Sequence, residues 1–263
     1  MVKDIFKQVY PFTTENLNGY FPYLDLKNKS VLTVGSSLDQ AFNALVFGAK
    51  DICVYDINEY VKDFYNYKKK LVLIKDRNEF CEAVFECDMP IIKWHPSLDE
   101  YVFRNTYLQS EYNYNLLRYR LEEDNISFIN GDIFELDKYL GNNSYDRILF
   151  SNILAYIDYS ALDRNIDDEL LLLKDKFGSF ISHLNNGGLL QLMYYYNYNP
   201  FCAEEGSIYD VIKLKELLNC DFDMRLIPSV YGGSSNEDGV LLYKKRTWYV
   251  FYDRMMLVKY LWI

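Results

Sequence analysis

The stretch KSVLTVGSSLDQAFNALVFGAKDICVYDIN, Lys29 to Asn58, decides the fold. Its apolar run over 30–34 leads straight into Gly35, which is typical of a buried parallel strand that enters a tight turn. Apolar residues then recur with helical spacing over 38–47. Residues 51–57 read as a second strand, with Asp56 near its end. This order predicts a strand–turn–helix–strand unit of a parallel sheet.

The same alternation continues through most of the chain. Because strands that alternate with helices form parallel sheets, we expect a Rossmann-like, seven-stranded, mostly parallel sheet of the α/β class with helices on both faces. The last two strands follow each other without a helix, which predicts that the last strand is antiparallel. Beyond the opening stretch we expect strands at 126–129, 145–154, 189–195, 225–230 and 239–243 and helices at 59–74, 135–140, 162–184 and 207–218.

The chain of 263 residues shows no internal repeat and no low-complexity linker. We therefore expect a single domain over 1–263, with an N-terminal extension at 1–28 and a helical insertion at 75–115.

Composition limits the classes of partner. A net charge of −10, from 28 basic and 38 acidic residues, leads us to expect no nucleic-acid partner. Five scattered cysteines and two histidines favour reduced thiols over a metal site. No run is long and apolar enough to span a membrane and no signal peptide is visible, so we expect a cytoplasmic protein. The cations and aromatics of 244–263 suit peripheral membrane contact or a packed terminal element, and the oligomeric state stays open.

A ligand site is expected beyond the carboxyl ends of the strands. Gly35, Ser36 and Ser37 form a small-residue turn that a ligand can approach closely, and Asp56 can accept hydrogen bonds from a ribose diol. Asp39 could cap its own helix or bind a ligand amine, and we leave both open.

Two classes of adenosine ligand compete for this site. Dinucleotides usually need Gly-x-Gly-x-x-Gly, but this chain has Ser37 and Gln40 at the second and third glycine positions. S-adenosylmethionine has no phosphate and tolerates such a turn. We therefore expect S-adenosylmethionine as the cofactor, with Asp132 beside the adenine, and with Ser151 and Asn152 where a substrate meets the sulfonium.

The chain resembles the class I S-adenosylmethionine-dependent methyltransferases. The segments that carry the resemblance are VLTVGSS (31–37), VYDIN (54–58), NGDIF (130–134) and YDRILFSNIL (145–154). It implies that residues 35–37 border the methionine moiety, that Asp56 holds the ribose, and that Asp132 with Ile133 frames the adenine, with Ile57 beside them. Thr33 stands where the family usually has an acidic residue.

A narrower resemblance covers 28–75. VLTVGSSLDQAFNAL looks like the motif of the 3-amino-3-carboxypropyl transferases of betaine-lipid synthesis, through Leu32, Thr33, Asp39 and Asn43. Such enzymes use the same cofactor but transfer a different group from it.

The function that we expect is group transfer from S-adenosylmethionine. A methyltransferase with a small-molecule or lipid acceptor is our first expectation, with Asn152 and Tyr156 as candidate catalytic residues that orient the acceptor. Aminocarboxypropyl transfer and a non-catalytic relic that keeps the fold are the alternatives. A nicotinamide-dependent oxidoreductase is weakened by the missing glycines.

Overall fold

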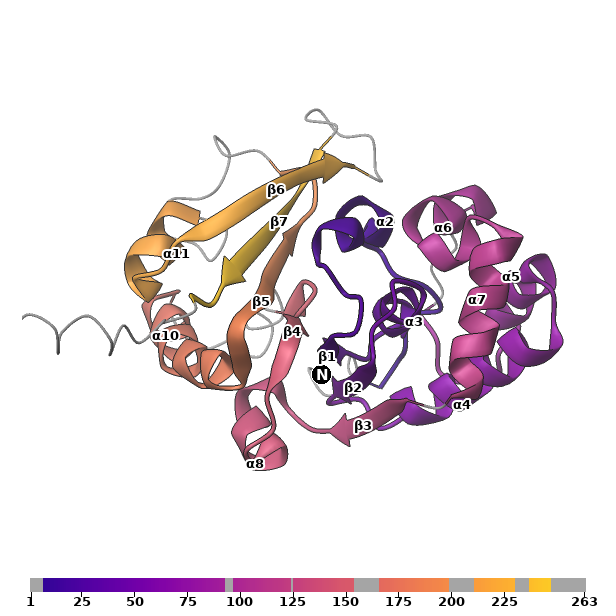
Figure 1. The fold of residues 1–263 in the computed structure, drawn as a ribbon, viewed down its shortest axis with the longest axis horizontal. Helices are drawn as coiled ribbons and strands as arrows, with labels where there is room; N and C mark the ends of the chain where they lie inside the picture. The colour runs from indigo at the N-terminus through magenta and orange to yellow at the C-terminus, as the bar shows by residue number, and fades with distance from the viewer. Residues whose placement is uncertain are drawn as a thin grey trace, which may run out of the picture.

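One sheet of seven strands runs through the residues that the computed structural model describes, which are 7–92, 97–123, 125–153, 166–198, 211–229 and 237–246 (Figure 1). The spatial order is β3-β2-β1-β4-β5-β7-β6. β1 to β5 pair in parallel, and β7 runs antiparallel to both β5 and β6. The predicted fold class is therefore confirmed. The bounds are β1 Ser30–Val34, β2 Asp51–Asp56, β3 Ile126–Asn130, β4 Tyr145–Leu149, β5 Leu184–Tyr195, β6 Phe222–Pro228 and β7 Glu237–Lys244.

Helices cover both faces of this sheet. One face carries the helices that follow β1 and β2 together with those of the expected insertion, and the other face carries the later helices (Figure 1). The first group is α3 Asp39–Val46, α4 Val61–Ile74, α5 Arg77–Phe85, α6 Leu98–Arg104, η2 Thr106–Leu108 and α7 Glu111–Glu122, with α2 Leu17–Tyr20 and η1 Phe21–Tyr23 before β1. The second group is η3 Ile133–Glu135, α8 Leu136–Leu140, α10 Ile166–Ser182 and α11 Val211–Leu218.

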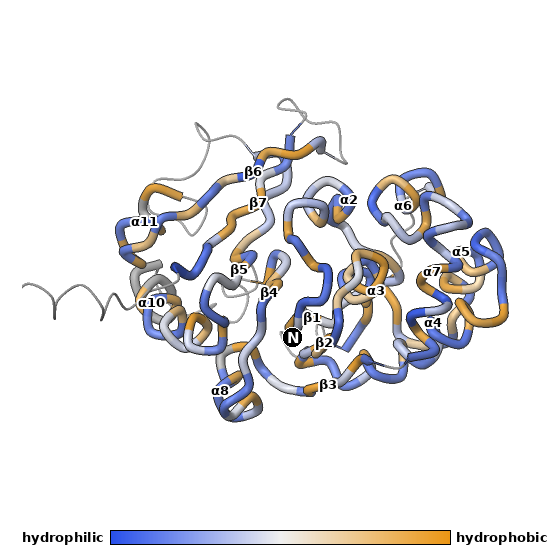
Figure 2. Tube along the Cα trace, in the orientation of Figure 1, coloured by the Kyte–Doolittle hydropathy of each residue, from blue (hydrophilic) through white to orange (hydrophobic). Residues whose placement is uncertain are grey.

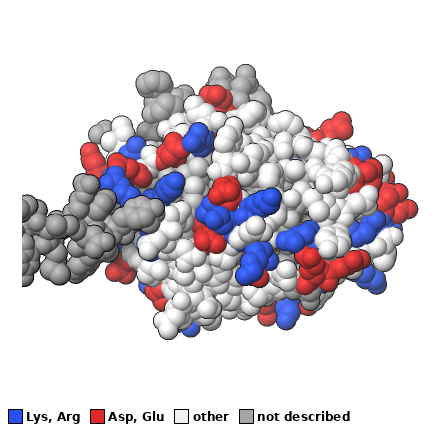
Figure 3. All heavy atoms as spheres, viewed as in Figure 1, with Lys and Arg blue, Asp and Glu red and all other residues white. Residues whose placement is uncertain are grey.

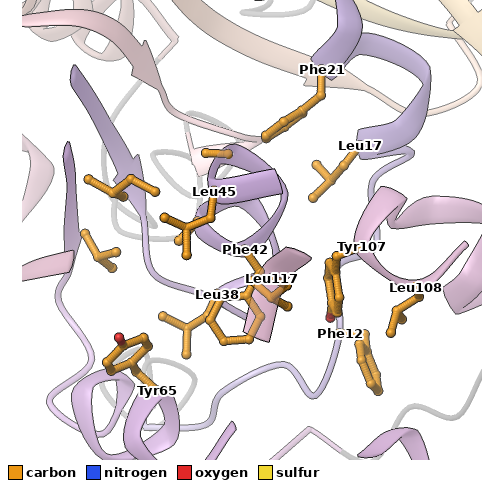
Figure 4. Close-up of a cluster of buried hydrophobic side chains, with 14 of the residues drawn as sticks. Phe12, Leu17, Phe21, Leu38, Phe42, Leu45, Tyr65, Tyr107, Leu108 and Leu117 are labelled. Carbon is orange, nitrogen blue, oxygen red and sulfur yellow. The ribbon is translucent and has the colours of Figure 1, made fainter. Parts of the chain in front are cut away.

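Two hydrophobic cores lie on opposite faces of the sheet because side chains alternate along each strand. Along β1, Val31 belongs to the first core, and Leu32 and Val34 belong to the second. Figure 2, coloured by hydropathy, shows apolar residues in the strands and in the helices on both sides of the sheet. In Figure 4, residues from the N-terminal extension, such as Phe12, lie beside Phe42 of α3 and Tyr107 of η2. The extension and the insertion are thus packed into the first core.

Some element bounds differ from those expected. β4 ends five residues before the predicted end at 154, because the backbone of Ser151 takes a left-handed φ of 61°. β5 begins at Leu184 and includes residues 185–188, which the sequence pattern assigned to a helix stop. The register between β4 and β5 shifts there, and Gly187 has a φ of 74° that suits the irregularity.

The surface and the described helices bear on the expected partners. On the face shown in Figure 3, acidic and basic side chains are interspersed. Every helix within the described residues is too short or too polar to cross a bilayer. Among these same residues, no three His, Cys, Asp or Glu side chains gather in a way that could hold a metal ion. The expected membrane contact of 244–263 falls mostly on 247–263, outside the described residues.

Candidate functional site

The turn after β1 brings backbone and carboxylate together. Ser36 and Leu38 have left-handed φ values of 39° and 69°, a conformation that side chains disfavour. A methyl group on Gly35 would lie 2.5 Å from Val61 Cγ1 and 2.9 Å from Asp56 Oδ2. Only glycine therefore allows β2 and α4 to approach this turn so closely.

Asp56 closes the turn from the neighbouring strand. Its Oδ2 accepts a hydrogen bond of 2.7 Å from the Ser36 N–H, and its Oδ1 accepts one of 2.8 Å from the Asn58 N–H. Burial raises the pKa of the Asp56 carboxyl, and the backbone N–H groups oppose that effect. The turn and the carboxylate therefore meet at one point, as the expected nucleoside site requires.

The end of β3 lies against the same point. The Asn130 side chain donates to the carbonyls of Asp56 and Ile57, at 3.1 and 3.2 Å. Ile57 is 48% exposed, while Ile133 is buried. Asp132 is partly buried, and its carbonyl accepts from the backbone of η3. Ile57, Asp132 and Ile133 thus lie near the ends of the neighbouring strands β2 and β3, and their contact with adenine stays a prediction.

Asp39 has a partner set that the sequence did not suggest. Its Oδ1 accepts from Lys68 Nζ at 2.7 Å and from the Tyr107 hydroxyl at 2.8 Å, and its Oδ2 accepts from the Thr13 N–H at 2.6 Å. Asp39 is fully buried, and Ser37 beside it is 3% exposed. A ligand amine would have to displace one of these partners to reach Asp39.

Lys68 is the cation that holds this turn in place. Its ammonium, fully buried, also donates to the carbonyls of Pro11 and Ser37, at 3.0 and 2.9 Å. Burial lowers the pKa of Lys68, and the Asp39 carboxylate opposes that effect. Four phenylalanine rings surround the ammonium within cation–π distance. They are Phe12 at 4.6 Å, Phe42 and Phe64 at 5.5 Å, and Phe80 at 5.9 Å.

Residues 8–16, here called the N-terminal strap, cross the carboxyl ends of four strands. The contacts follow the spatial order β2, β1, β4, β5. After β2, Asn58 Nδ2 donates to the Gln8 carbonyl, and after β1, Asp39 accepts from the Thr13 N–H. After β4, the Ser151 hydroxyl donates to the Glu15 carboxylate. On β5, the Tyr194 hydroxyl accepts from the Asn16 N–H. The strap therefore forms a cover over the edge where the ligand is expected.

Glu15 is the strap residue that sequence reasoning missed. It is 1% exposed, and its carboxylate accepts hydrogen bonds from Ser151 Oγ, from the Tyr20 hydroxyl at 2.9 Å and from Gln40 Nε2 at 3.3 Å. Burial raises the pKa of Glu15 to about 7, against the lowering effect of these donors. The one signal in the sequence was Thr33, which replaces the family's acidic residue and donates to Gln40 at 2.6 Å.

The loop after β4 is fixed by a buried amide. The Ser151 N–H donates to Gln191 Oε1 at 2.7 Å, and Gln191 Nε2 donates to the Ser151 carbonyl at 3.0 Å. Gln191 is fully buried, whereas Ser151 and Asn152 are partly exposed. Tyr156, the other predicted catalytic residue, lies outside the described residues.

Several solved structures are similar to this one in the course of the chain. An rRNA methylase from Streptococcus thermophilus matches with a TM-score of 0.42 and 12% identity, over 84% of this chain and 90% of that chain. The N-methyltransferase NodS from Bradyrhizobium japonicum WM9, in complex with S-adenosyl-L-homocysteine, gives 0.44 and 11%, over 85% and 83%. The magnesium protoporphyrin IX methyltransferase ChlM from Synechocystis PCC 6803, with bound S-adenosylmethionine, gives 0.43 and 10%, over 86% and 74%.

Comparison of sequences gives no further relative. No family model matches the chain, and no curated protein matches it. Nothing in the comparisons supports the narrower resemblance to the betaine-lipid enzymes specifically.

One expectation about partners was wrong. The net charge of −10 led us to exclude nucleic acid, yet the similar structures include an rRNA methylase from Streptococcus thermophilus and a protein from Clostridium thermocellum described as a "putative rRNA-methylase". Net charge is a property of the whole chain, whereas nucleic-acid contact depends on the charge of one surface. The exclusion is therefore withdrawn.

Proposed function

We propose that this protein is an S-adenosylmethionine-dependent group transferase, with methyl transfer as its reaction. The observation that carries the proposal is the hydrogen bond of 2.7 Å between the Ser36 N–H and Asp56 Oδ2. It places a small-residue turn, the start of α3 and a carboxylate at the carboxyl edge of a parallel sheet, where β2 and β4 flank β1 and the strand order reverses.

The residues present fit the nucleoside half of this cofactor. Asp56 accepts hydrogen bonds from the Ser36 and Asn58 N–H groups, and the N–H groups of Ile57 and Gly35 also stabilise its charge. Asp56 is still partly exposed at the strand end, where a carboxylate suits the hydroxyls of a ribose. Ile57, half-exposed after β2, offers apolar surface to an adenine ring.

The chain's own contribution would be orientation. When bound, S-adenosylmethionine supplies an electrophilic carbon on a sulfonium whose leaving group is a neutral thioether. Ser151 and Asn152, held by Gln191 at the end of β4, would orient the acceptor nucleophile. Orientation of this kind accounts for much of the rate of a transfer between two bound molecules.

Calorimetric titration with S-adenosylmethionine and with S-adenosylhomocysteine tests the proposal. Both ligands should bind, and Asp56→Ala should weaken both by at least about tenfold, because two charge-assisted hydrogen bonds to the ribose are lost. Asp146→Asn is the matched control: Asp146 lies at the opposite end of the sheet, where it accepts from Ser30. Equal affinity in the wild type and Asp56→Ala would refute the site.

Aminocarboxypropyl transfer from the same cofactor is the finer alternative. The two reactions leave different products, S-adenosylhomocysteine after methyl transfer and methylthioadenosine after aminocarboxypropyl transfer. Mass spectrometry of the nucleoside product, with a panel of amine, lipid and RNA acceptors, separates them. Methylthioadenosine formed only in the presence of an acceptor would replace methyl transfer as the assignment.

A non-catalytic relic is the second candidate, and one observation favours it. Ser37 and Asp39, both predicted to bind the cofactor, are enclosed by Lys68 and the strap. A protein that has lost its ligand has no reason to keep them exposed. The absence of any heat of binding at millimolar S-adenosylmethionine would make this candidate the assignment.

A further inference from the structure

A buried carboxylate lies one hydrogen bond from the expected reaction centre. Glu15 is 1% exposed, and the Ser151 hydroxyl that donates to it belongs to a partly exposed residue after β4. The backbone of Ser151 is held on both sides by the buried Gln191 amide. Ser151 therefore connects Glu15 to the edge of the sheet where β1 and β4 end.

The surroundings of Glu15 contain no positive partner among the described contacts. Its three hydrogen-bond donors, Ser151, Tyr20 of α2 and Gln40 of α3, are neutral. Asp238 of β7 opposes the ionisation of Glu15, and Tyr194 of β5 donates to Asp238 at 2.6 Å. The buried cation nearest along the strap, Arg104 of α6, donates to the Thr13 carbonyl at 3.2 Å. An ionised carboxylate is seldom buried without a cation, because its desolvation is then uncompensated.

The Lys68–Asp39 pair shows the contrast within the same molecule. Asp39, also fully buried and also bonded to the strap, has a buried ammonium at 2.7 Å. Glu15 accepts three hydrogen bonds but has no cation among its described hydrogen-bond partners. A cationic ligand at the strand ends would supply it.

We infer that Glu15, acting through Ser151, is a positioning residue that faces the sulfonium group of the cofactor and is ionised while that cation is bound. This inference rests on the proposed function. It also gives Glu15 a second role in the reaction. Once the neutral thioether remains, Glu15 takes up the proton that the alkylated acceptor loses.

The proton and electron balance of that step is complete within the site. A lone pair of an amine or hydroxyl acceptor forms the new bond to carbon, and the carbon–sulfur bond breaks with its electron pair on sulfur. The positive charge then resides on the acceptor, which gives its proton to Ser151 Oγ. Ser151 passes its own hydroxyl proton to the Glu15 carboxylate, so no further reactant is required.

The comparison of two ligands tests the inference without an acceptor. S-adenosylmethionine and S-adenosylhomocysteine differ by a methyl group and one positive charge. Burial raises the pKa of Glu15 to about 7. At about pH 7 the carboxyl is then about half protonated, so the cation should release about half a proton that the neutral ligand does not release. Calorimetry in buffers of different ionisation enthalpy measures this difference.

Two variants at the pair and one control make the result specific. Glu15→Gln should abolish the difference in proton release and reduce the preference for S-adenosylmethionine over S-adenosylhomocysteine by about tenfold. Ser151→Ala keeps the carboxylate but removes a donor that stabilises its charge, so the release should persist and move to higher pH. Asp146→Asn, at the far end of β4, should match the wild type.

The possible results distinguish the role of Glu15 from the proposed transferase function. Binding of both ligands with equal proton release in the wild type and both variants overturns the role of Glu15 and leaves the transferase intact. Failure of both ligands to bind the wild type overturns the two together. If Glu15→Gln does not fold, the pH shift in Ser151→Ala decides, because that side chain is partly exposed and its loss leaves the fold in place.

Discussion

Replacement of Lys68 by methionine should be the most damaging single change that leaves the candidate site residues in place. The ammonium is fully buried and donates to Asp39, to the Pro11 carbonyl of the strap and to the Ser37 carbonyl of the turn. Methionine keeps the length and the apolar contact with the surrounding phenylalanine rings. The change therefore removes the charge and the three hydrogen bonds.

The expected cost follows from what remains behind. Asp39 would stay buried as an uncompensated carboxylate, and removal of one partner of a buried pair costs about 3–5 kcal/mol. Most of this cost should disappear if Asp39 is neutralised as well, since the amide oxygen of asparagine can still accept from the Thr13 N–H while its NH₂ group donates to the Tyr107 hydroxyl. The double variant Lys68→Met, Asp39→Asn should therefore be more stable than the sum of the single variants by at least about 2 kcal/mol.

Urea denaturation of the wild type, both single variants and the double variant measures this coupling. Calorimetry with S-adenosylhomocysteine on the same set shows whether the loss of Lys68 also weakens ligand binding. We expect that it does, because the Ser37 carbonyl of the turn loses its hydrogen bond from Lys68. Additive effects of the two substitutions, or a cost below about 1 kcal/mol for Lys68→Met, would refute the view that this pair holds the turn and the strap together.

Three further predictions concern the turn and the strap. Gly35→Ala should lose about 1–3 kcal/mol in thermal or urea denaturation, because the new methyl group meets Val61 at 2.5 Å. Ser36→Gly should cost nothing or gain up to about 1 kcal/mol, since the φ of 39° favours glycine; a clear loss would show that the Ser36 side chain matters. The pKa of Glu15 is raised from 4.5 to about 7, so the folded state binds its proton more tightly. Stability should therefore fall by up to about 3 kcal/mol as pH rises from about 4.5 to 7, and Glu15→Gln should flatten that part of the profile.

The fold could be predicted because its signals are local. Each strand and helix of the parallel part is encoded by its own apolar spacing, and Gly35 marks the end of the first strand. The errors arose where tertiary contacts overrode the local signal. Residues 185–188 resemble a helix stop, yet the pairing with β4 draws them into β5 through a shift in register.

The site could be predicted only in part, for the same reason. Gly35 and Asp56 lie in the two strand ends that the opening stretch encodes, and their convergence follows from the register of β1 and β2. Glu15 carries no such signal, because it reaches Ser151 across 136 positions. Lys68 does carry one: it has the helical spacing of Phe64, Leu71 and Val72, which places it on the buried face of α4, but that spacing does not reveal Asp39 as its partner.

The strap also determines the order in which the molecule can be completed during its synthesis. The Asn16 N–H bonds to Tyr194, 178 positions later, and its side chain bonds to the Pro228 carbonyl, 212 positions later. The end of the strap at Asn16 can therefore dock only after β5 and β6 have been synthesised, whereas Thr13 and Gln8 can bond to Asp39 and Asn58 much earlier. Contacts of such long range form slowly, because a large loop must close first. The part of the cover over β4 and β5 thus forms later than the part over β1 and β2, and a nascent chain exposes that part of the edge until β5 has been synthesised.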